Sequence, residues 1–229
     1  MINYIEAINK GHNDGLKGNS NSYIIGLGVN YDNGADGTTK GLSALYPDKI
    51  LDVPVSESAV TGMCVGMATM GLNPIVHHGR VEFALYAMDQ ILTQAAKWNY
   101  MFDGNSGTVN ITIRLIVGRG WGQEPTHSQN LQSWFAHIPG LKVVMPATAR
   151  DAKGLLLSSI FDNNPVIFLE HRWLHNLEGE VAADDYRVEI GKATVLREGI
   201  DITIVSMSYM TIEALHACDA LETIGISCE

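Results

Sequence analysis

Short apolar segments alternate with helical segments along most of this 229-residue chain. The segments 22–28, 109–117 and 166–170 are apolar without the every-second-residue alternation that a half-exposed strand shows. Strands that are apolar on both faces are typical of a parallel sheet covered by helices on both sides. We therefore predict an α/β fold with a parallel sheet and helices on both of its faces.

The order of the elements follows from apolar spacing and from turn residues. The expected strands are residues 22–28, 49–53, 73–78, 109–117, 142–145 and 166–170. The expected helices are residues 4–15, 41–46, 57–70, 83–100, 131–136 and 149–161. Segment 30–39 is rich in Asn, Asp and Gly and superficially resembles a calcium or phosphate loop. It lacks both the distal glutamate of such a calcium loop and a following Gly-Lys-Ser/Thr, so an ordinary loop is favoured.

The composition changes after Glu170, where no clear period continues. We predict a first domain at residues 1–178, a linker at 179–200 and the beginning of a second α/β domain at 201–229. Within that last part, a strand at 201–206 and a helix at 211–223 are expected, and a further strand starts at 225–227. A strand–helix–strand unit without a sheet to join buries little surface. We therefore expect the natural protein to continue this domain beyond Glu229.

Composition excludes several classes of function. The net charge is −10 and the Lys and Arg residues are scattered, which argues against a nucleic-acid surface. No apolar run reaches the length of a membrane span, and the first residues lack the layout of a signal peptide. The three cysteines have no Cys-x-x-Cys spacing, so reduced thiols in the cytoplasm are expected.

The stretch from Asp52 to Glu57 places an acid at the entrance of a helix. Pro54 cannot donate to a strand ladder and marks the exit of strand 49–53, and Ser56 is suited to the N-cap. Glu57 then lies in the first turn of a helix that is apolar nearly all round and is expected to be buried. Such an acid is either a partner of the helix dipole or a functional group, and the pattern alone leaves both readings open.

Several polar residues follow the ends of predicted strands. They are Glu57, His77, the segment 114–127 and Glu170. In open parallel sheets, ligands bind beyond the carboxyl ends of the strands, so these residues are expected to meet at one edge. His77 and His78 are adjacent on a strand and point to opposite faces, which makes them a poor pair of metal ligands.

A long series of ordered motifs resembles the β subunits of thiamine diphosphate-dependent 2-oxo acid dehydrogenases, the decarboxylating first component of the pyruvate and branched-chain complexes. The resemblance runs nearly end to end and stops early in the C-terminal, transketolase-type domain of that family. The matching segments are 52–57 (DVPVSE), 88–91 (MDQI), 95–97 (AAK), 127–129 (HSQ), 136–144 (AHIPGLKVV), 151–156 (DAKGLL), 162–170 (DNNPVIFLE), 191–193 (GKA) and 197–199 (REG).

The resemblance assigns roles to three residues. Glu57 is the acid that hydrogen-bonds N1′ of the aminopyrimidine of thiamine diphosphate, Phe83 stacks on that ring, and His127 is the active-site histidine that contacts the substrate or the cofactor. A carboxyl suits this place because a proton shared with N1′ activates the cofactor as a nucleophile. From the pattern alone, a core position of Phe83 in its helix is the alternative. The resemblance therefore implies the pyrimidine-binding half of a catalytic site.

The resemblance also implies metals and partners. The Gly-Asp-Gly…Asn-Asn motif that holds Mg²⁺ and the diphosphate is absent from the sequence, so an α subunit is expected to supply that half. The implied assembly is an α2β2 tetramer with a homodimeric β contact, and a lipoyl acyltransferase is a further partner of the family. Some relatives bind K⁺ at the segment that corresponds to Ile160, Asp162 and Asn164.

Departures from the family bear on the substrate. Where these dehydrogenases usually carry Gly-Glu-Asp, this chain has Gly-Leu-Gly at 26–28, and His77 replaces a glutamate of the family. The loop 118–127 carries Pro-Thr-His and leans toward transketolases. The candidate residues of the substrate pocket are His77, Arg80, Arg119 and Trp121.

Three functional hypotheses follow from the sequence. The leading one is a β subunit that, with an α subunit, decarboxylates a 2-oxo acid and transfers the acyl group to lipoamide. The second is ketol transfer on sugar-type substrates, as in transketolases. The third is a non-catalytic assembly module, against which the joint presence of Glu57, Phe83 and His127 argues. Without its partner the chain is expected to be inactive.

Overall fold

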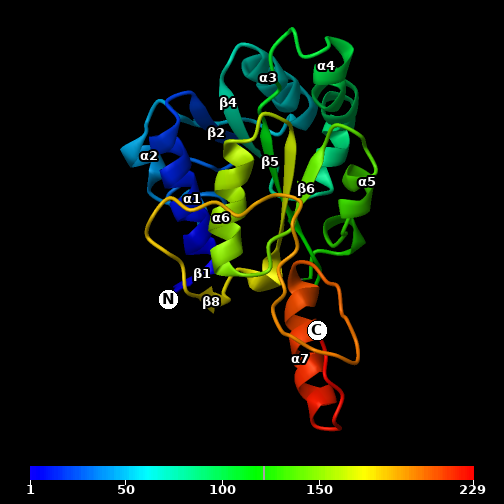
Figure 1. Cartoon of the computed structure of the whole chain (residues 1–229). Coiled ribbons are helices and arrows are strands. Elements are labelled where there is room, and N and C mark those ends of the chain that lie inside the picture. Colours follow the sequence, from blue (N-terminus) through cyan, green and yellow to red (C-terminus); the bar gives the residue numbers. More distant parts are fainter. Residues whose placement is uncertain (121) are drawn as a thin grey trace.

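A six-stranded sheet forms the centre of the computed structural model, which describes residues 1–120 and 122–229 (Figure 1). The strand order is β3-β2-β4-β5-β7-β6, and every neighbouring pair is parallel. The strands are β2 (Ser22–Gly26), β3 (Ile50–Asp52), β4 (Asn73–His77), β5 (Thr112–Val117), β6 (Lys142–Val144) and β7 (Val166–His171). The predicted α/β fold with a parallel sheet is confirmed.

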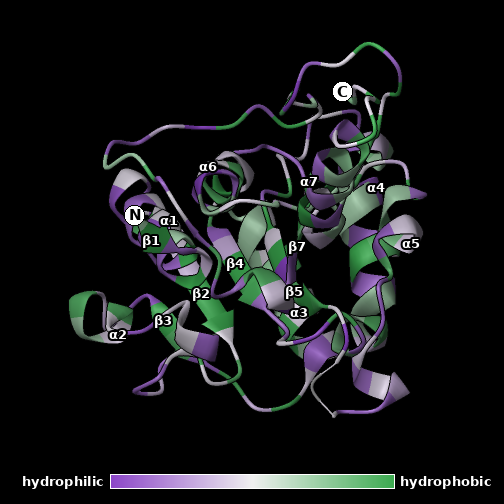
Figure 2. Cartoon of the chain, turned by 90° about the horizontal axis from the view of Figure 1, so that it is seen from below, coloured by the Kyte–Doolittle hydropathy of each residue, from purple (hydrophilic) through white to green (hydrophobic). Residues whose placement is uncertain are grey.

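Helices cover both faces of this sheet. The helices in the described part of the chain are α1 (Tyr4–Gly18), α2 (Leu42–Leu45), α3 (Glu57–Thr69), α4 (Ala96–Met101), α5 (Gln132–Ala136), α6 (Ala149–Ile160) and α7 (Tyr209–Glu222), and the last of these does not cover the sheet. Figure 2 shows α1 and α6 on one side of the strands and α3 on the other. A small antiparallel pair of β1 (Ile2–Asn3) and β8 (Glu178–Gly179) ties the start of the chain to the segment that follows β7. No helix in the described part of the chain is long and apolar enough to cross a membrane.

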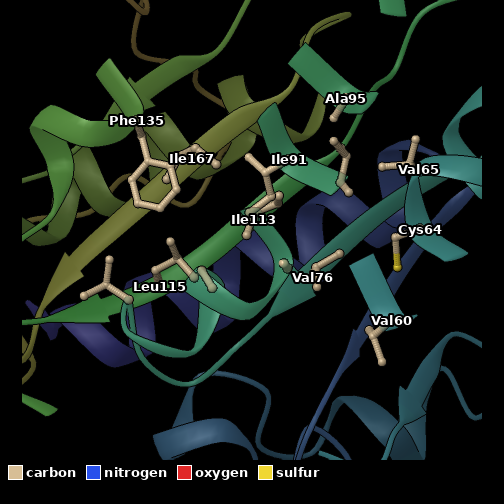
Figure 3. Close-up of a cluster of buried hydrophobic side chains, with 14 of the residues drawn as sticks. Val60, Cys64, Val65, Val76, Ile91, Ala95, Ile113, Leu115, Phe135 and Ile167 are labelled. Atoms are coloured by element: carbon tan, nitrogen blue, oxygen red, sulfur yellow. The ribbon is translucent and has the colours of Figure 1, made fainter. Parts of the chain in front are cut away.

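Two apolar cores result, one on each face. On the α1 and α6 side, Tyr4, Ile8 and Leu156 are fully buried against the sheet. On the other side, Figure 3 shows residues of α3 and α5 packed on the strands, among them Cys64 and Phe135. Full burial of a large apolar side chain contributes roughly 1.5–3 kcal/mol relative to exposure. These two cores explain why the strands are apolar without alternation.

The starts of two helices are fixed by capping residues. Asn3 Oδ1 accepts a hydrogen bond of 2.8 Å from the Glu6 amide, and the Glu6 carboxylate accepts one of 3.1 Å from the Asn3 amide. This reciprocal capping box satisfies two amides that a helix start otherwise leaves free. Thr148 caps α6 in a similar way, because its hydroxyl accepts from the Asp151 amide at 3.0 Å. Local sequence therefore sets where α1 and α6 begin.

The predicted single helix over residues 83–100 is wrong in its geometry. The segment begins as a 3-10 helix, η2 (Phe83–Ala87), continues as a π-helix, η3 (Asp89–Ala95), and ends as α4. The buried residues explain this sequence of turns, since Ala84 and Ala87 are three apart, whereas Ile91 and Ala95 follow at intervals of four. The 3-10 helix followed by the π-helix therefore keeps these four side chains in the core. π-helical turns are rare and are frequent at functional sites.

Two expectations about α3 need correction. The helix is not buried nearly all round, because Met63 is 47% exposed on its outer face and Ala59 and Gly66 are exposed as well. In addition, Ser56 stands at the N-cap position without a side-chain hydrogen bond to the helix. The inner face of α3 packs on the sheet and on η2, and no described residue covers the outer face near Met63. This outer face is an exposed apolar surface beside Glu57.

The C-terminal part forms a helix but no regular strand. Helix α7 agrees with the predicted helix, and it lies beyond one end of the sheet in Figure 1. The strand predicted at 201–206 is reduced to one isolated parallel bridge between Ile202 and Cys228. The backbone hydrogen bonds of residues 201–204 go to residues 227–229, and these few pairings do not make a regular ladder. The predicted domain boundaries remain a prediction.

A buried ion pair joins the neighbouring strands β5 and β7. The Nη2 of Arg114 in β5 lies 2.5 Å from Oε1 of Glu170 in β7, and both side chains are fully buried. The Nη1 of Arg114 also donates to the hydroxyl of Thr38 at 3.2 Å and lies 3.4 Å from Nε2 of His12. Burial raises the pKa of Glu170, although the adjacent guanidinium acts in the opposite direction. One cation thus connects β5, β7, α1 and the loop 30–39.

Replacing this cation should strongly destabilise the fold. Arg114→Met leaves the Glu170 carboxylate buried without its partner, and loss of one member of a buried pair typically costs about 3–5 kcal/mol. Urea denaturation measures the free energy of unfolding directly. Lys192→Met is the matched control, because it breaks an exposed pair with Glu189 at 2.8 Å and should leave the unfolding midpoint nearly unchanged. Equal losses of stability in the two variants would contradict the role assigned to the buried pair.

Candidate active site

A cavity of about 500 Å³ lies beyond the carboxyl ends of β2, β3 and β4. Its walls are mostly apolar, with one carboxyl and two imidazoles among them. The lining residues are Leu27, Val53, Pro54, Val55, Ser56, Glu57, Val60, His77, His78, Gly79, Phe83 and Tyr86. Apolar walls with a few convergent polar groups are typical of small-molecule sites. The position agrees with the edge of the sheet that the sequence predicts.

Glu57 enters this cavity because β3 ends just before it. Oδ1 of Asp52 accepts a hydrogen bond of 2.5 Å from the Gly28 amide, which holds the exits of β2 and β3 together. Pro54 follows, and Glu57 is the first residue of α3. Its side chain is half-buried, since the outer face of α3 is open. The carboxyl is therefore held by a rigid strand end and is still accessible.

Phe83 and His127 complete the group of residues that the sequence singles out. Phe83 is the first residue of η2 and lines the same cavity as Glu57. It is half-buried and stands outside the core cluster, so the alternative role as a core residue is not favoured. The ring of His127 lies edge-on to Phe83, with centroids 5.3 Å apart and planes at 86°. The fold thus brings Glu57, Phe83 and His127 to one place.

The two histidines at the end of β4 point to opposite faces, as predicted. Nε2 of His78 is 2.8 Å from the hydroxyl of Thr61 in α3. His77 lies on the other face beside Arg114, and its buried Nδ1 has no hydrogen-bond partner in the described part of the chain. Burial lowers the pKa of both rings, that of His78 to about 4, and the Arg114 charge further lowers the pKa of His77. Both imidazoles are therefore neutral near pH 7.

The candidate residues of the substrate pocket do not all lie at one site. Arg80 is buried beside the loop that carries His127, and its Nη1 donates to the His127 carbonyl at 3.4 Å. Arg119 is exposed and lines a different cavity of about 620 Å³ together with Trp173 and Tyr209. The structure does not bring Arg119 to Glu57. Trp121 lies outside the described residues.

Glu82 is a further residue at this site that sequence reasoning missed. Its Oε1 accepts a hydrogen bond of 2.6 Å from the Gln129 amide, two residues after His127. Glu82 is only 7% exposed. The available signal was an acid placed directly between the apolar Val81 and Phe83, where a carboxylate is buried only if it has a partner.

The predicted potassium ligands are already engaged within the chain. Asp162 forms an ion pair of 2.5 Å with Lys142 and accepts from the Asn164 amide at 2.9 Å. Partial burial raises the pKa of Asp162, but Lys142 and Asn164 outweigh this effect and hold it below its ordinary value. The Ile160 carbonyl accepts from the side-chain amide of Asn73. The Asp162 carboxylate is therefore engaged within the chain, and a potassium site on the carbonyls of this segment stays a prediction. Among the described residues, no group of three or more His, Cys, Asp or Glu side chains is arranged to hold a metal ion.

Comparisons with known proteins agree with this geometry. Residues 2–176 match the family described as "Transketolase, pyrimidine binding domain", so the chain belongs to that family. The fold is also that of a solved structure titled "Split gene transketolase, inactive beta4 tetramer", with a TM-score of 0.80 and 23% sequence identity. That similarity covers 99% of this chain and 70% of the solved chain.

Three named relatives of this chain are all β subunits. The chain is 46% identical over 196 residues to the β subunit of an acetoin:2,6-dichlorophenolindophenol oxidoreductase from Cupriavidus necator, covering 86% of this chain and 58% of the relative. It is 38% identical over 229 residues to the 2-oxoisovalerate dehydrogenase subunit beta of Bacillus subtilis, covering 99% and 70%. It is 37% identical to the pyruvate dehydrogenase E1 component subunit beta of the same organism, covering 100% and 71%. The predicted resemblance to these β subunits is confirmed, and the chain spans between 58% and 71% of the length of these three relatives.

Acid should destabilise the fold through its buried histidines. Burial lowers the pKa of His78 and of His175 to about 4, whereas the unfolded rings take up protons near an ordinary pKa of about 6.5. Between these values the unfolded state binds more protons, so stability is full above about pH 6.5 and falls as the pH is lowered. Each ring should account for a loss of roughly 2 kcal/mol between about pH 7 and about pH 5.

Urea denaturation at the two pH values tests this expectation. Burial also lowers the pKa of His12 and of His77, so these two rings add to the loss of stability in acid. Burial raises the pKa of Glu170, which reduces that loss. In His78→Gln the difference in unfolding free energy between the two pH values should shrink, because one titrating ring is gone. A free energy of unfolding that is the same at both pH values would refute the assigned neutral state of these rings.

Proposed function

We propose that the chain is the β subunit of a thiamine diphosphate-dependent enzyme that decarboxylates a 2-oxo acid and transfers the acyl group, with lipoamide as the acceptor. The observation that carries the proposal is that Glu57 and Phe83 line one cavity, on a chain of the pyrimidine-binding family. His127 lies against Phe83 and adds an imidazole to the same site.

The donor set fits the aminopyrimidine of thiamine diphosphate. A carboxyl at the start of α3 can share a proton with a ring nitrogen, and the half-buried ring of Phe83 offers a face for stacking. When bound, the cofactor supplies the carbanion-stabilising group of the reaction. Within this chain, Glu57 holds the proton at the pyrimidine, Phe83 orients the ring, and His127 supplies a polar contact or a proton at the substrate.

The diphosphate and Mg²⁺ are assigned to an α subunit. The cavity is rimmed by exposed apolar side chains, including Leu27 (49% exposed), Val55 (71%) and Tyr86 (75%), and the exposed Met63 of α3 extends this surface. An apolar rim at the mouth of a site is suited to a protein partner. We propose an α2β2 assembly with a β–β contact, acting with a lipoyl acyltransferase. The three free cysteines of the chain are in keeping with the cytoplasm.

Ketol transfer is the second candidate. The 3-10 turn of Pro125–His127 presents a Pro-Thr-His sequence of the kind found in transketolases, Arg80 contacts this turn, and the neutral His77 lines the cavity together with Phe83. These groups suit a polar, sugar-like donor. Assays of the αβ pair with pyruvate, branched 2-oxo acids and ketose phosphates separate the two reactions, because only decarboxylation releases CO₂.

Glu57→Gln should abolish turnover of the αβ pair and leave the fold intact. The amide cannot share a proton with the pyrimidine nitrogen, and loss of such a group typically lowers the rate about 10²–10⁴-fold. Release of CO₂ measures turnover, and circular dichroism checks the fold. Asp89→Asn, an exposed acid at the start of η3, is the matched control and should keep full activity.

Two results would overturn the proposal. One is a co-purified αβ pair that binds no thiamine diphosphate by calorimetry. The other is unchanged turnover in Glu57→Gln, which would remove the assigned role of this carboxyl.

A further inference from the structure

The loop that carries His127 is held in part by residues outside it. Its base is closed by a hydrogen bond of 3.5 Å from the Gly118 amide to the Gln129 carbonyl. Gly118, Gly120 and Gly122 have φ values of 108°, 92° and 76°, which glycine adopts readily and other residues rarely do. A glycine-rich loop of this kind has many accessible conformations, so the place of His127 depends on contacts from outside the loop.

Those contacts come from residues 80–83, between β4 and η2. Nη1 of Arg80 donates to the His127 carbonyl at 3.4 Å, and Nη2 donates to the side-chain carbonyl of Gln123. Oε1 of Glu82 accepts from the Gln129 amide at 2.6 Å. The loop is therefore held on both sides of His127, by a cation before it and by an anion after it.

The holding segment is itself attached to the sheet. The Val81 amide donates to the Ile116 carbonyl of β5 at 3.0 Å, and the Val81 side chain is fully buried in the core. Arg80 and Glu82 flank this anchor, and each is only 7% exposed. A hydrogen bond from an amide to a buried carboxylate is roughly twice as strong as a neutral one, and leaving either partner unmatched is costly.

We propose that Glu82 is a positioning residue which, together with Arg80, fixes His127 against Phe83. Its carboxylate touches the backbone of the loop rather than the reacting atoms. The catalytic consequence rests on the proposed function, whereas the position of His127 can be measured without any turnover.

The first test uses the full chain. Arg119 is exposed at the start of the loop and provides a tryptic site. Cleavage after Arg119 should be about tenfold faster in Glu82→Ala than in the wild type, because the loop opens more often once the bond to the Gln129 amide is lost. Glu82→Gln keeps an acceptor oxygen at the same reach and should restore slow cleavage. Glu198→Ala, which removes an exposed acid elsewhere, is the matched control.

The second test observes His127 itself. In a chain with isotopically labelled histidine, the His127 ring signals should shift and broaden in Glu82→Ala, and return in Glu82→Gln. Glu82→Asp retains the charge but is one methylene shorter, so it should behave like Glu82→Ala even if the alanine variant folds poorly. Wild-type cleavage and wild-type His127 signals in Glu82→Asp and Glu82→Ala would overturn the proposal, as would failure of Glu82→Gln to restore either readout.

The third test adds the α partner and separates this proposal from the proposed function. In the αβ pair, Glu82→Ala should lower kcat about tenfold with little change in KM or in the affinity for thiamine diphosphate, since Glu57 and Phe83 are untouched. An inactive wild-type pair whose His127 signals still depend on Glu82 would remove the proposed reaction and leave the positioning role standing. If the αβ pair is active and neither its kcat nor its His127 signals change in the Glu82 variants, the positioning role is removed and the proposed reaction stands.

Discussion

The Arg114–Glu170 pair is the interaction on which the site-bearing edge of the sheet depends. It joins β5 to β7, Arg114 lies in register with the cavity residue His77 of β4, and through Thr38 the pair also holds the loop that follows β2. A buried pair of this kind contributes little net stability compared with apolar packing, but it is severely destabilising when one member is removed. Its value here is geometric, because the contact between the two charged groups ties β5 to β7 next to β4, the strand whose end carries His77 into the site.

The same cation determines the charge state of its neighbours. Burial, and then the Arg114 charge, lower the pKa of His12 and of His77 well below the ordinary value. His77 therefore faces the cavity as a neutral ring, and it can serve as a hydrogen-bonding group but not as a reserve of protons near pH 7. Under the proposed function, proton transfer at this edge is left to Glu57 and His127, whose side chains are half-buried rather than buried.

The sequence predicts those parts of the molecule that depend on neighbouring residues or on a regular spacing of apolar residues. The strands are recognisable because both faces are buried, and Glu57 is found because a proline ends β3 just before it. The 3-10 and π turns of 83–95 depend on how Ile91 and its neighbours meet the sheet, which no local period encodes. The contact of Glu82 with Gln129 joins residues 47 positions apart, and the engagement of Asp162 by Lys142 joins residues 20 apart. Such pairings appear only once the loops have been placed in space.

The proposed function also accounts for the half-exposed state of Glu57. A carboxyl takes up a proton more readily when water is excluded, and interactions with a bound ring strengthen in the same environment. In this chain the mouth of the cavity is open and is bordered by Leu27, Val55 and Tyr86. If a partner surface covered these side chains, it would exclude water from the Glu57 carboxyl and bury the apolar rim at the same time. Association with an α subunit and activation of Glu57 are then a single event, which is the physical reason to expect no turnover from this chain by itself.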